Sequence, residues 1–355
     1  MTKKLKSISL FAGAGGMDVG VKDAGFKILA ASELDPHACN TFRANHKDTK
    51  LFEGDINDHH DSLEKYKNID LIFGGPPCQG FSVAGKMDPK DPRSSLVFSF
   101  CDVVKSIRPR AFVMENVASL GKLTKFQNVR EEIYKQMSEA GYNVNMFILN
   151  AKDYGVPQSR ERVFFVGTDK NLAPVSEYAF EDYKKEPKTL REAISHLGKA
   201  GSEGNPNVTN AKITLALKPV MRRSPYAGML FNGQGRPLNP DAWSSTLPAS
   251  VGGNRTPIVD EDHLYENKPS WVEKYHQKLM SGKIKSKFKE APSRLRRLTI
   301  DEVAILQTFP KNYEFCGPKS KIFSQIGNAV PCKLAMVVAL GIKKSLLHQA
   351  HKSQP

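Results

Sequence analysis

Apolar, β-rich runs alternate with helix-like segments through the first half of the chain, and this alternation restricts the possible folds more than any other feature. The β-rich runs cover residues 5–11, 27–33, 68–74, 110–116, 142–151 and 162–168. Stretches with the apolar spacing of helices intervene at 17–26, 34–46, 94–107 and 129–141. Such alternation predicts an α/β fold with a doubly wound, mostly parallel sheet that helices cover on both faces. Ligands are then expected at the carboxyl ends of the strands.

The composition changes after about residue 185. Residues 201–260 are rich in Gly, Asn, Pro, Ser and Thr, which is typical of irregular loops between short strands. Helical patterning returns at 296–310 and 325–347. Because a chain of 355 residues exceeds the usual size of one core, we expect two domains, although a large α/β unit with an insertion fits as well.

The charge balance points to a polyanionic partner. The formal net charge is +15 and the pI is about 9.4. Nucleic acid is favoured over an acidic membrane, because the apolar run at 335–342 is far shorter than the roughly 20 residues of a membrane span. The apolar part of the N-terminus is likewise too short for a secretory signal.

The five cysteines are odd in number and include no CxxC pair, so we expect no disulfide framework, no metal site and a reducing cytoplasm.

Basic residues are concentrated at 270–297. This segment holds nine Lys or Arg against two acidic residues, with Trp271, Tyr275 and Phe288 interleaved. A solvated helical face is one interpretation of such a run. A surface that contacts phosphates is favoured, because nearly half of the surplus charge of the chain lies in these 28 residues.

A glycine-rich turn follows the first predicted strand. Gly13, Gly15 and Gly16 stand where a strand gives way to a helix, so a ligand can approach the backbone there without meeting a β-carbon. A tight turn without a ligand is the alternative. Glu33 ends the second strand and Asp55 follows the third, which places two carboxylates on the same edge of the sheet. This arrangement suits a cofactor that carries an adenosine.

A cysteine stands just beyond another strand. In "GGPPCQGFS" at 74–82 the prolines cannot continue the strand, so Cys78 is expected at its carboxyl end. Glu115 ends the neighbouring predicted strand, and Arg160 and Arg162 precede a further one. Cationic neighbours lower the pKa of a thiol and so favour the reactive thiolate. A nucleophile, an acid and two arginines on adjacent strand ends indicate a site for covalent catalysis.

These blocks, taken in order, resemble the DNA cytosine-5 methyltransferases, of the bacterial or phage modification type. The blocks are "FAGAGG" at 11–16, Glu33, "GDI" at 54–56, "GGPPCQGFS" at 74–82, "ENV" at 115–117, "QSRERVFFVG" at 158–167, "RRLTIDEVAILQTFP" at 296–310 and "QIGNAVP" at 325–331. The resemblance spans the chain except for the segment between the arginine motif and residue 296. So many ordered blocks are far more specific than a single motif.

The resemblance implies a Rossmann-like methyltransferase that transfers a methyl group from S-adenosylmethionine to carbon 5 of a cytosine rotated out of double-stranded DNA. It implies that residues 1–185 and 318–355 form the catalytic and cofactor-binding domain, and that 186–317 form a target-recognition domain and hinge. Asn232, Gln234, Arg236, Asn254 and Arg255 are of types that can read base edges. A cognate restriction endonuclease, a monomeric state and a cytoplasmic, nucleoid-associated location also follow from it as expectations.

The resemblance also assigns roles to individual residues. Cys78 would attack carbon 6 of the base, Glu115 would bind its nitrogen 3, and Arg160 and Arg162 would hold its carbonyl oxygen and order the catalytic loop, to which Gln79 and Ser82 belong. The cofactor, with S-adenosylhomocysteine as its product, would contact Phe11, Gly13, Gly15, Gly16, Glu33, Leu34, Asp55, Ile56, Pro77, Leu96, Asn328 and Ala329. Ser9 departs from the aspartate common in the family, so it receives no role, and no metal is expected.

Three other functions are possible alternatives, and the sequence offers an argument against each. A relative of this fold methylates transfer RNA, but the Cys-Phe-Thr signature of that branch is absent. A DNA-binding regulator without activity would not need Cys78, Glu115 and both arginines. A nicotinamide dehydrogenase would need a GxGxxG turn, which the first glycine loop does not supply.

Overall fold

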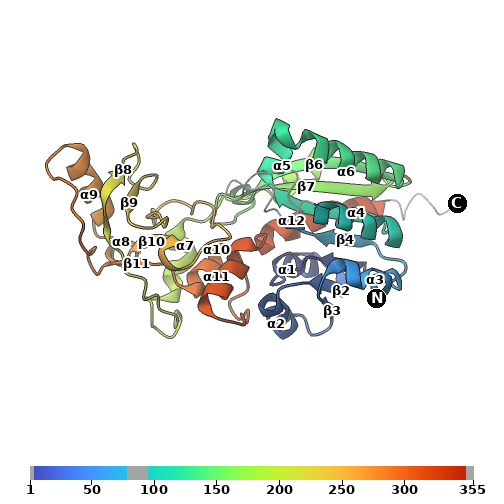
Figure 1. Ribbon diagram of the computed structural model, residues 1–355, viewed down its shortest axis with the longest axis horizontal. Helices are drawn as coiled ribbons and strands as arrows, with labels where there is room; N and C mark the ends of the chain where they lie inside the picture. Colours follow the sequence, from blue (N-terminus) through green and yellow to red (C-terminus); the bar gives the residue numbers. More distant parts are fainter. Residues whose placement is uncertain (1–3, 78–94, 349–355) are drawn as a thin grey trace.

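The computed structural model describes residues 4–77 and 95–348, and its long axis runs through two lobes (Figure 1). One lobe contains a seven-stranded sheet with its covering helices, and the other contains short strands, helices and loops. Helices α10 (Ile300–Leu306) and α11 (Lys319–Asn328) lie between the lobes in this view.

The sheet has the strand order β3-β2-β1-β4-β5-β7-β6. Its strands are β1 (Lys6–Leu10), β2 (Lys27–Glu33), β3 (Lys50–Glu53), β4 (Leu71–Gly74), β5 (Ala111–Val117), β6 (Tyr142–Asn150) and β7 (Glu161–Asp169). Pairing is parallel except that β7 runs antiparallel to both β5 and β6. The prediction of a mostly parallel α/β sheet is thus confirmed. The order reverses between β1 and β4, which is where sheets of this kind bind ligands.

Helices bury their apolar sides against both faces of this sheet. One face is covered by α3 (His60–Glu64), α4 (Leu96–Ile107), α5 (Ala118–Lys122) and α6 (Gln127–Glu139). The other is covered by α1 (Gly16–Asp23) and α12 (Cys332–His348). Helix α2 (Pro36–Asn45) contacts β2 and β3. A Pro in its first turn and the Asp35 carboxylate, which accepts hydrogen bonds from two backbone amides, fix where α2 begins.

Helix α12 packs closely on α1 although about 300 residues separate them in the chain. Gly20 makes the approach possible, since a β-carbon at this position would lie 2.2 Å from the carbonyl oxygen of Cys332. The sheet core therefore joins the beginning and the end of the chain, and Val21 and Leu334 belong to the same buried cluster.

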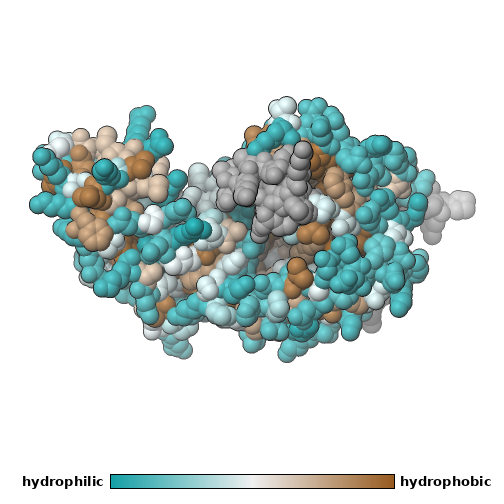
Figure 2. Space-filling view, viewed as in Figure 1, coloured by the Kyte–Doolittle hydropathy of each residue, from teal (hydrophilic) through white to brown (hydrophobic). Residues whose placement is uncertain are grey.

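The second lobe is built from small elements. They are α7 (Leu190–Ile194), β8 (Leu215–Val220), β9 (Met229–Phe231), β10 (Ile258–Asp260), α8 (Glu261–Glu266), α9 (Trp271–Met280) and β11 (Leu295–Arg297). Its strands pair in two separate two-stranded sheets, β8-β9 and β10-β11. Hydrophilic residues cover most of the face in Figure 2, and apolar residues gather over the lobe that carries α9. Exposed apolar residues from this lobe include Leu217, Val220, Met280 and Phe288.

The structure corrects part of the expectation for the basic segment 270–297. Trp271 and Tyr275 stack on each other with ring centroids 4.8 Å apart and contribute to the small core, so they are not free to stack on nucleic acid. Its three arginines are also engaged within the fold (Arg294, Arg296 and Arg297). Phe288 is 68% exposed, and the lysines of the segment remain at the surface.

Candidate functional site

The glycine-rich turn between β1 and α1 contains left-handed backbone. Gly13 and Gly15 have φ values of 57° and 82°, and Phe11 also has a positive φ of 53°. The backbone amide of Gly13 donates to a carboxylate oxygen of Glu33 at 2.7 Å, and the amide of Asp35 donates to the other oxygen at 2.8 Å. A β-carbon at Gly13 would meet nothing within 4 Å, so the turn is open on that side.

Most of the residues predicted to bind a cofactor lie along one edge of the sheet. Glu33 ends β2, Asp55 follows β3, and Pro77 is the last described residue beyond β4. Burial raises the pKa of the Glu33 carboxyl despite its amide donors. Leu34 is 64% exposed, whereas Ile56 is buried. The Asp55 carboxylate accepts from the backbone amide of Asn57 at 2.9 Å.

The end of α11 lies against the same turn. A β-carbon on Gly16 would lie 2.9 Å from the β-carbon of Ala329, which brings Asn328 and Ala329 to the start of α1. Leu96 begins α4 and is half-buried. The structure therefore brings the glycine turn, Glu33 and Ala329 together from three distant parts of the chain.

Glu115 and Arg162 form an ion pair at the boundary of β5 and β7. The guanidinium Nε of Arg162 lies 2.9 Å from a carboxylate oxygen of Glu115, and both side chains are nearly buried. Burial raises the pKa of Glu115, and the cationic Arg162 offsets part of this rise. Gly75 leaves room for the carboxylate, since a β-carbon there would lie 2.7 Å from a Glu115 oxygen. The side-chain amide of Asn116 donates to the carbonyl of Pro76 at 3.2 Å.

Arg160 has different surroundings from Arg162. It is fully buried, and its guanidinium donates to the carbonyl of Leu247 at 2.6 Å and to that of Gly327 at 2.7 Å. These bonds connect the start of β7 with the second lobe and with α11. The sequence predicted both arginines at the site but not this difference, which depends on partners 87 and 167 residues away.

A buried pair of glutamines continues this connection and was not predicted. The amide nitrogen of Gln158 donates to the side-chain oxygen of Gln307 at 3.1 Å, and the backbone amide of Leu247 donates to Gln158 at 2.9 Å. Both glutamines are fully buried. Gln307 follows the apolar run 303–306, and this was the available signal for it, because a buried amide requires partners. Gln158 stands among polar residues and had no such signal.

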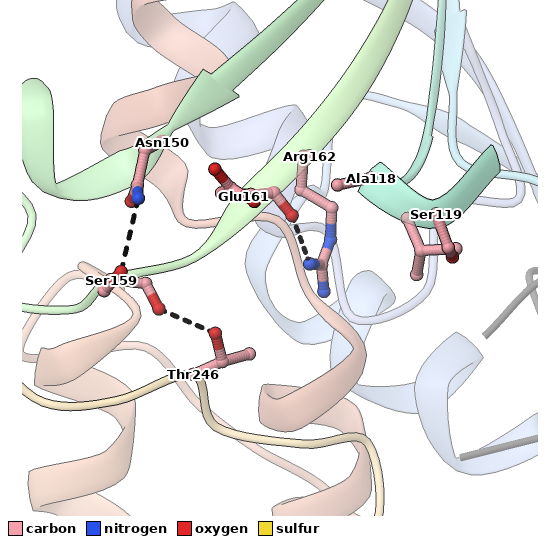
Figure 3. Close-up of a pocket in the computed structure, with 8 residues that line it drawn as sticks. Ala118, Ser119, Asn150, Ser159, Glu161, Arg162 and Thr246 are labelled. Carbon is pink, nitrogen blue, oxygen red and sulfur yellow. Dashed lines mark hydrogen bonds between the residues drawn. The ribbon is translucent and has the colours of Figure 1, made fainter. Parts of the chain in front are cut away.

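A pocket of about 410 Å³ opens where β5, β6 and β7 approach the second lobe (Figure 3). Its lining is largely polar and consists of Val117, Ala118, Ser119, Asn150, Ser159, Glu161, Arg162 and Thr246. The Asn150 side-chain amide donates to the Ser159 hydroxyl at 3.2 Å, and the Thr246 hydroxyl donates to the Ser159 carbonyl at 2.6 Å. Thr246 belongs to the second lobe, so both lobes line this pocket. Ser119, Asn150, Ser159 and Thr246 were not among the predicted site residues.

Cys78 lies outside the described residues, as do Gln79 and Ser82. Pro77, which precedes Cys78 in the sequence, lies three residues beyond the end of β4. Among the other cysteines, burial raises the pKa of the Cys39 and Cys101 thiols to about 12 and that of Cys332 further still. These three thiols are therefore poor candidates for a nucleophile.

In residues 4–77 and 95–348, no three His, Cys, Asp or Glu side chains are placed to hold a metal ion, and no helix is long and apolar enough to cross a membrane.

Comparisons with known proteins agree on one family. The sequence model described as C-5 cytosine-specific DNA methylase matches residues 5–344. The type II methyltransferase M1.HphI of Haemophilus parahaemolyticus is 35% identical over 348 residues, which cover 96% of this chain and 87% of that protein. M.FnuDI of Fusobacterium nucleatum is 34% identical, with 96% and 95% covered.

Solved structures share the fold. The Dnmt2 methyltransferase of S. pombe superposes with a TM-score of 0.68 at 18% identity, covering 98% of this chain and 99% of its own. The methyltransferase EhMeth of Entamoeba histolytica gives 0.69 at 16% identity, with 97% and 99% covered. At these identities the likeness concerns the fold alone.

Proposed function

Since the chain belongs to the C-5 cytosine-specific DNA methylase family and is thus a DNA (cytosine-5)-methyltransferase, we propose that it takes the methyl group from S-adenosylmethionine and acts through a covalent adduct of Cys78. The observation that carries this proposal is the buried Glu115–Arg162 pair beside Gly75, in the segment that leads from β4 to Cys78. The pair supplies an acid and a cation beside Gly75, which precedes the predicted nucleophile by three residues in the sequence.

The residues at the sheet edge fit the proposed methyl donor. The turn at Gly13 is open to a ligand. Glu33 offers a carboxylate to the ribose hydroxyls, and the adjacent Leu34 offers an exposed apolar side chain. Phe11, Asp55, Ile56, Pro77, Leu96, Asn328 and Ala329 complete the proposed set. When bound, S-adenosylmethionine supplies an electrophilic methyl group on a sulfonium.

Cysteine chemistry makes carbon 5 of cytosine reactive. The Cys78 thiolate adds to carbon 6, forming a sulfur–carbon bond and leaving carbon 5 with enamine character. Carbon 5 would then form a bond to the methyl group as the sulfur–methyl bond of the donor breaks, with S-adenosylhomocysteine as the leaving group. The proton on carbon 5 leaves to a base and the thiolate is expelled, which restores the aromatic ring. Nucleophilic catalysis thereby divides one difficult step into easier ones.

Glu115 stabilises the adduct by sharing a proton with nitrogen 3 of the base. Its raised pKa favours the protonated carboxyl that this role requires. Arg162, which pairs with Glu115 and lines the pocket, donates to the carbonyl oxygen of the base, and the polar lining at Ser159 and Thr246 receives the flipped nucleotide. Rotation of the base out of the duplex costs a few kcal/mol, which contacts to the flipped base offset. Arg160 acts beside Arg162 by ordering the junction of the lobes.

The experiment that tests the mechanism replaces Cys78→Ser. We expect loss of methyl transfer and of the covalent complex with 5-fluorocytosine DNA, while S-adenosylmethionine binds with nearly the same affinity in calorimetry. Cys101→Ser serves as the control, because this buried thiol has no proposed role. A comparable loss of donor affinity in Cys78→Ser, or an adduct that still forms, contradicts the assignment.

Residues 186–317 form the proposed target-recognition domain, with 1–185 and 318–355 as the catalytic domain. Gln234, Arg236, Asn254 and Arg255 are exposed and available to bases or phosphates, whereas the Asn232 amide already bonds Thr214 and the carbonyl of Leu215. The relatives are type II methyltransferases, which supports a partner endonuclease acting on the same site. One pair of lobes suffices for base flipping, in keeping with a monomer.

Four lysines of this domain form a regular row that we assign to DNA phosphates. Lys283, Lys285, Lys287 and Lys289 are exposed at alternate positions, while Ser286 bonds the Leu217 carbonyl at 2.6 Å and the Leu215 amide bonds the Lys289 carbonyl at 2.8 Å. Residues 286–289 thus run along β8, where alternate residues of an extended chain point to one side, and Lys283 lies in the bend that precedes them.

A salt titration tests this row. Changing all four lysines to Gln is expected to make the salt dependence of DNA binding shallower. The negative slope of log K, the logarithm of the DNA association constant, against log salt should lose roughly 3 to 4 of its magnitude, without a change in which sequence is methylated. The matched control changes four exposed lysines of the sheet lobe to Gln (Lys47, Lys50, Lys65 and Lys67) and should leave the slope unchanged. Equal slopes in the wild type and the row variant would remove these lysines from the DNA contact.

A further inference from the structure

A tyrosine from the second half of the chain holds the glycine turn. The Tyr313 hydroxyl donates to the carbonyl of Ala14 at 2.5 Å, between Gly13 and Gly15. Nε2 of His46 lies 2.9 Å from the same hydroxyl oxygen. A tyrosine hydroxyl has one proton, which goes to Ala14, so His46 must donate its own Nε2–H to Tyr313. The hydrogen bonds therefore run from His46 through Tyr313 to the backbone of the turn.

Both rings are packed directly against the turn. A β-carbon on Gly15 would lie 2.4 Å from Nε2 of His46 and 2.6 Å from the Tyr313 oxygen. His46 stacks on Phe42 with centroids 4.4 Å apart, and Tyr313 packs against Phe309 with centroids 4.8 Å apart. The positive φ of Gly15 and this close contact leave the turn little room for another conformation.

Helix α2 fixes the position of the tyrosine. The Asn45 side chain exchanges two hydrogen bonds with the backbone of Glu314, at 2.8 and 3.0 Å. The Thr41 hydroxyl accepts from the amide of Cys316 at 2.8 Å and donates to Gln325 at 2.7 Å. The segment 313–316 is thus attached to α2 on one side and leads into α11 on the other.

Neither ring acts as an acid or base at neutral pH. Burial lowers the pKa of His46 to about 4 and raises the pKa of Tyr313 well above its ordinary value. Both groups therefore stay neutral and serve as fixed donors. The turn is held from two sides, since Glu33 binds the Gly13 amide while Tyr313 binds the Ala14 carbonyl.

We propose that Tyr313 and His46 are positioning residues that preform the glycine turn for the methyl donor and so set the affinity for S-adenosylmethionine. This inference rests on the proposed function of the turn. It connects donor affinity to the segment between α10 and α11, which contains no residue of the predicted cofactor set. The pair orders the backbone before the donor arrives, and preorganisation of this kind increases affinity.

Tyr313→Phe tests the proposal, because it removes only the hydroxyl. We expect the dissociation constant of S-adenosylmethionine and its KM to rise roughly five- to thirty-fold, as for a buried carbonyl that loses its donor. We expect kcat at saturating donor and the affinity for duplex DNA without donor to stay within about twofold. His46→Ala should weaken donor binding similarly, and His46→Gln, which keeps an N–H donor, should restore much of it.

Tyr178→Phe is the matched control, because Tyr178 is 72% exposed and its change also removes one phenolic hydroxyl. Unchanged donor affinity in Tyr313→Phe overturns the inference. An equal loss of donor affinity, DNA affinity and kcat also overturns it, since that pattern reflects general damage to the fold. If the wild type itself binds no S-adenosylmethionine in calorimetry, the proposed function fails first, so the two failures are distinguishable.

Discussion

Replacing Asp18 should change how the stability of the protein depends on pH. Asp18 lies in the first turn of α1, is 0% exposed, and neither carboxylate oxygen has a hydrogen-bond partner within the described residues. Burial raises its pKa from 3.8 to about 7. An ionised carboxylate in such a place is costly unless it is paired.

The size of the effect follows from the two pKa values. Between pH 3.8 and about 7 the folded protein keeps the Asp18 proton while the unfolded chain has lost it. Stability therefore falls as pH rises through this window, by roughly 4 kcal/mol in total. Roughly 3 kcal/mol of this loss develops between about pH 5 and about pH 8, and the curve is flat above it.

Asp18→Asn removes the titrating group, so its stability relative to the wild type should increase by roughly 3 kcal/mol between about pH 5 and about pH 8. Urea unfolding at several pH values measures this difference, and any constant effect of the new amide cancels between them. Asp23→Asn, an exposed change on the same helix, should show no such trend. A difference that does not vary with pH would refute the reasoning.

Three further outcomes follow from individual contacts. Gly20→Ala should lower the free energy of unfolding by several kcal/mol in urea, because the new β-carbon would lie 2.2 Å from the Cys332 carbonyl oxygen. Gly141→Ala should lower it by less, because the new β-carbon would meet open space and only the positive φ is unfavourable. Arg296→Ala should cost about 3–5 kcal/mol, since it leaves the buried Glu302 carboxylate without the cation that lies 2.6 Å from it, and an unchanged melting temperature would contradict this. Glu115→Gln should lower the single-turnover methylation rate by roughly 10²–10⁴-fold while donor affinity stays the same, and full activity would exclude the proton-sharing role.

Local patterns were sufficient to predict the sheet and its ligand edge. Strand ends are marked by glycine, proline or a carboxylate, so Glu33 and Glu115 could be placed at the edge from the alternation alone. The antiparallel placement of β7 between β5 and β6 could not, because it depends on pairing between segments rather than on any local period.

Contacts between distant segments account for what the sequence did not reveal. Arg160 precedes β7 whereas Arg162 is within it, and the period of a strand would put two residues so spaced on the same side. Distant partners make the difference, because Arg160 bonds the carbonyls of Leu247 and Gly327 at the junction of the lobes while Arg162 pairs with Glu115. Tyr313 and Trp271 show the same limit. An aromatic residue near basic residues has the same local pattern whether it stacks on a ligand, packs in a core or bonds a backbone 299 residues away.

The packing of α12 on α1 has a consequence for how the protein is made. About 300 residues must be translated after α1 before α12 exists, which takes roughly 15 to 60 s at ribosomal elongation rates. During that interval the nascent chain exposes the apolar side of α1 and the groove at Gly20. This apolar surface of α1 therefore lacks its native cover until the last helix has been made.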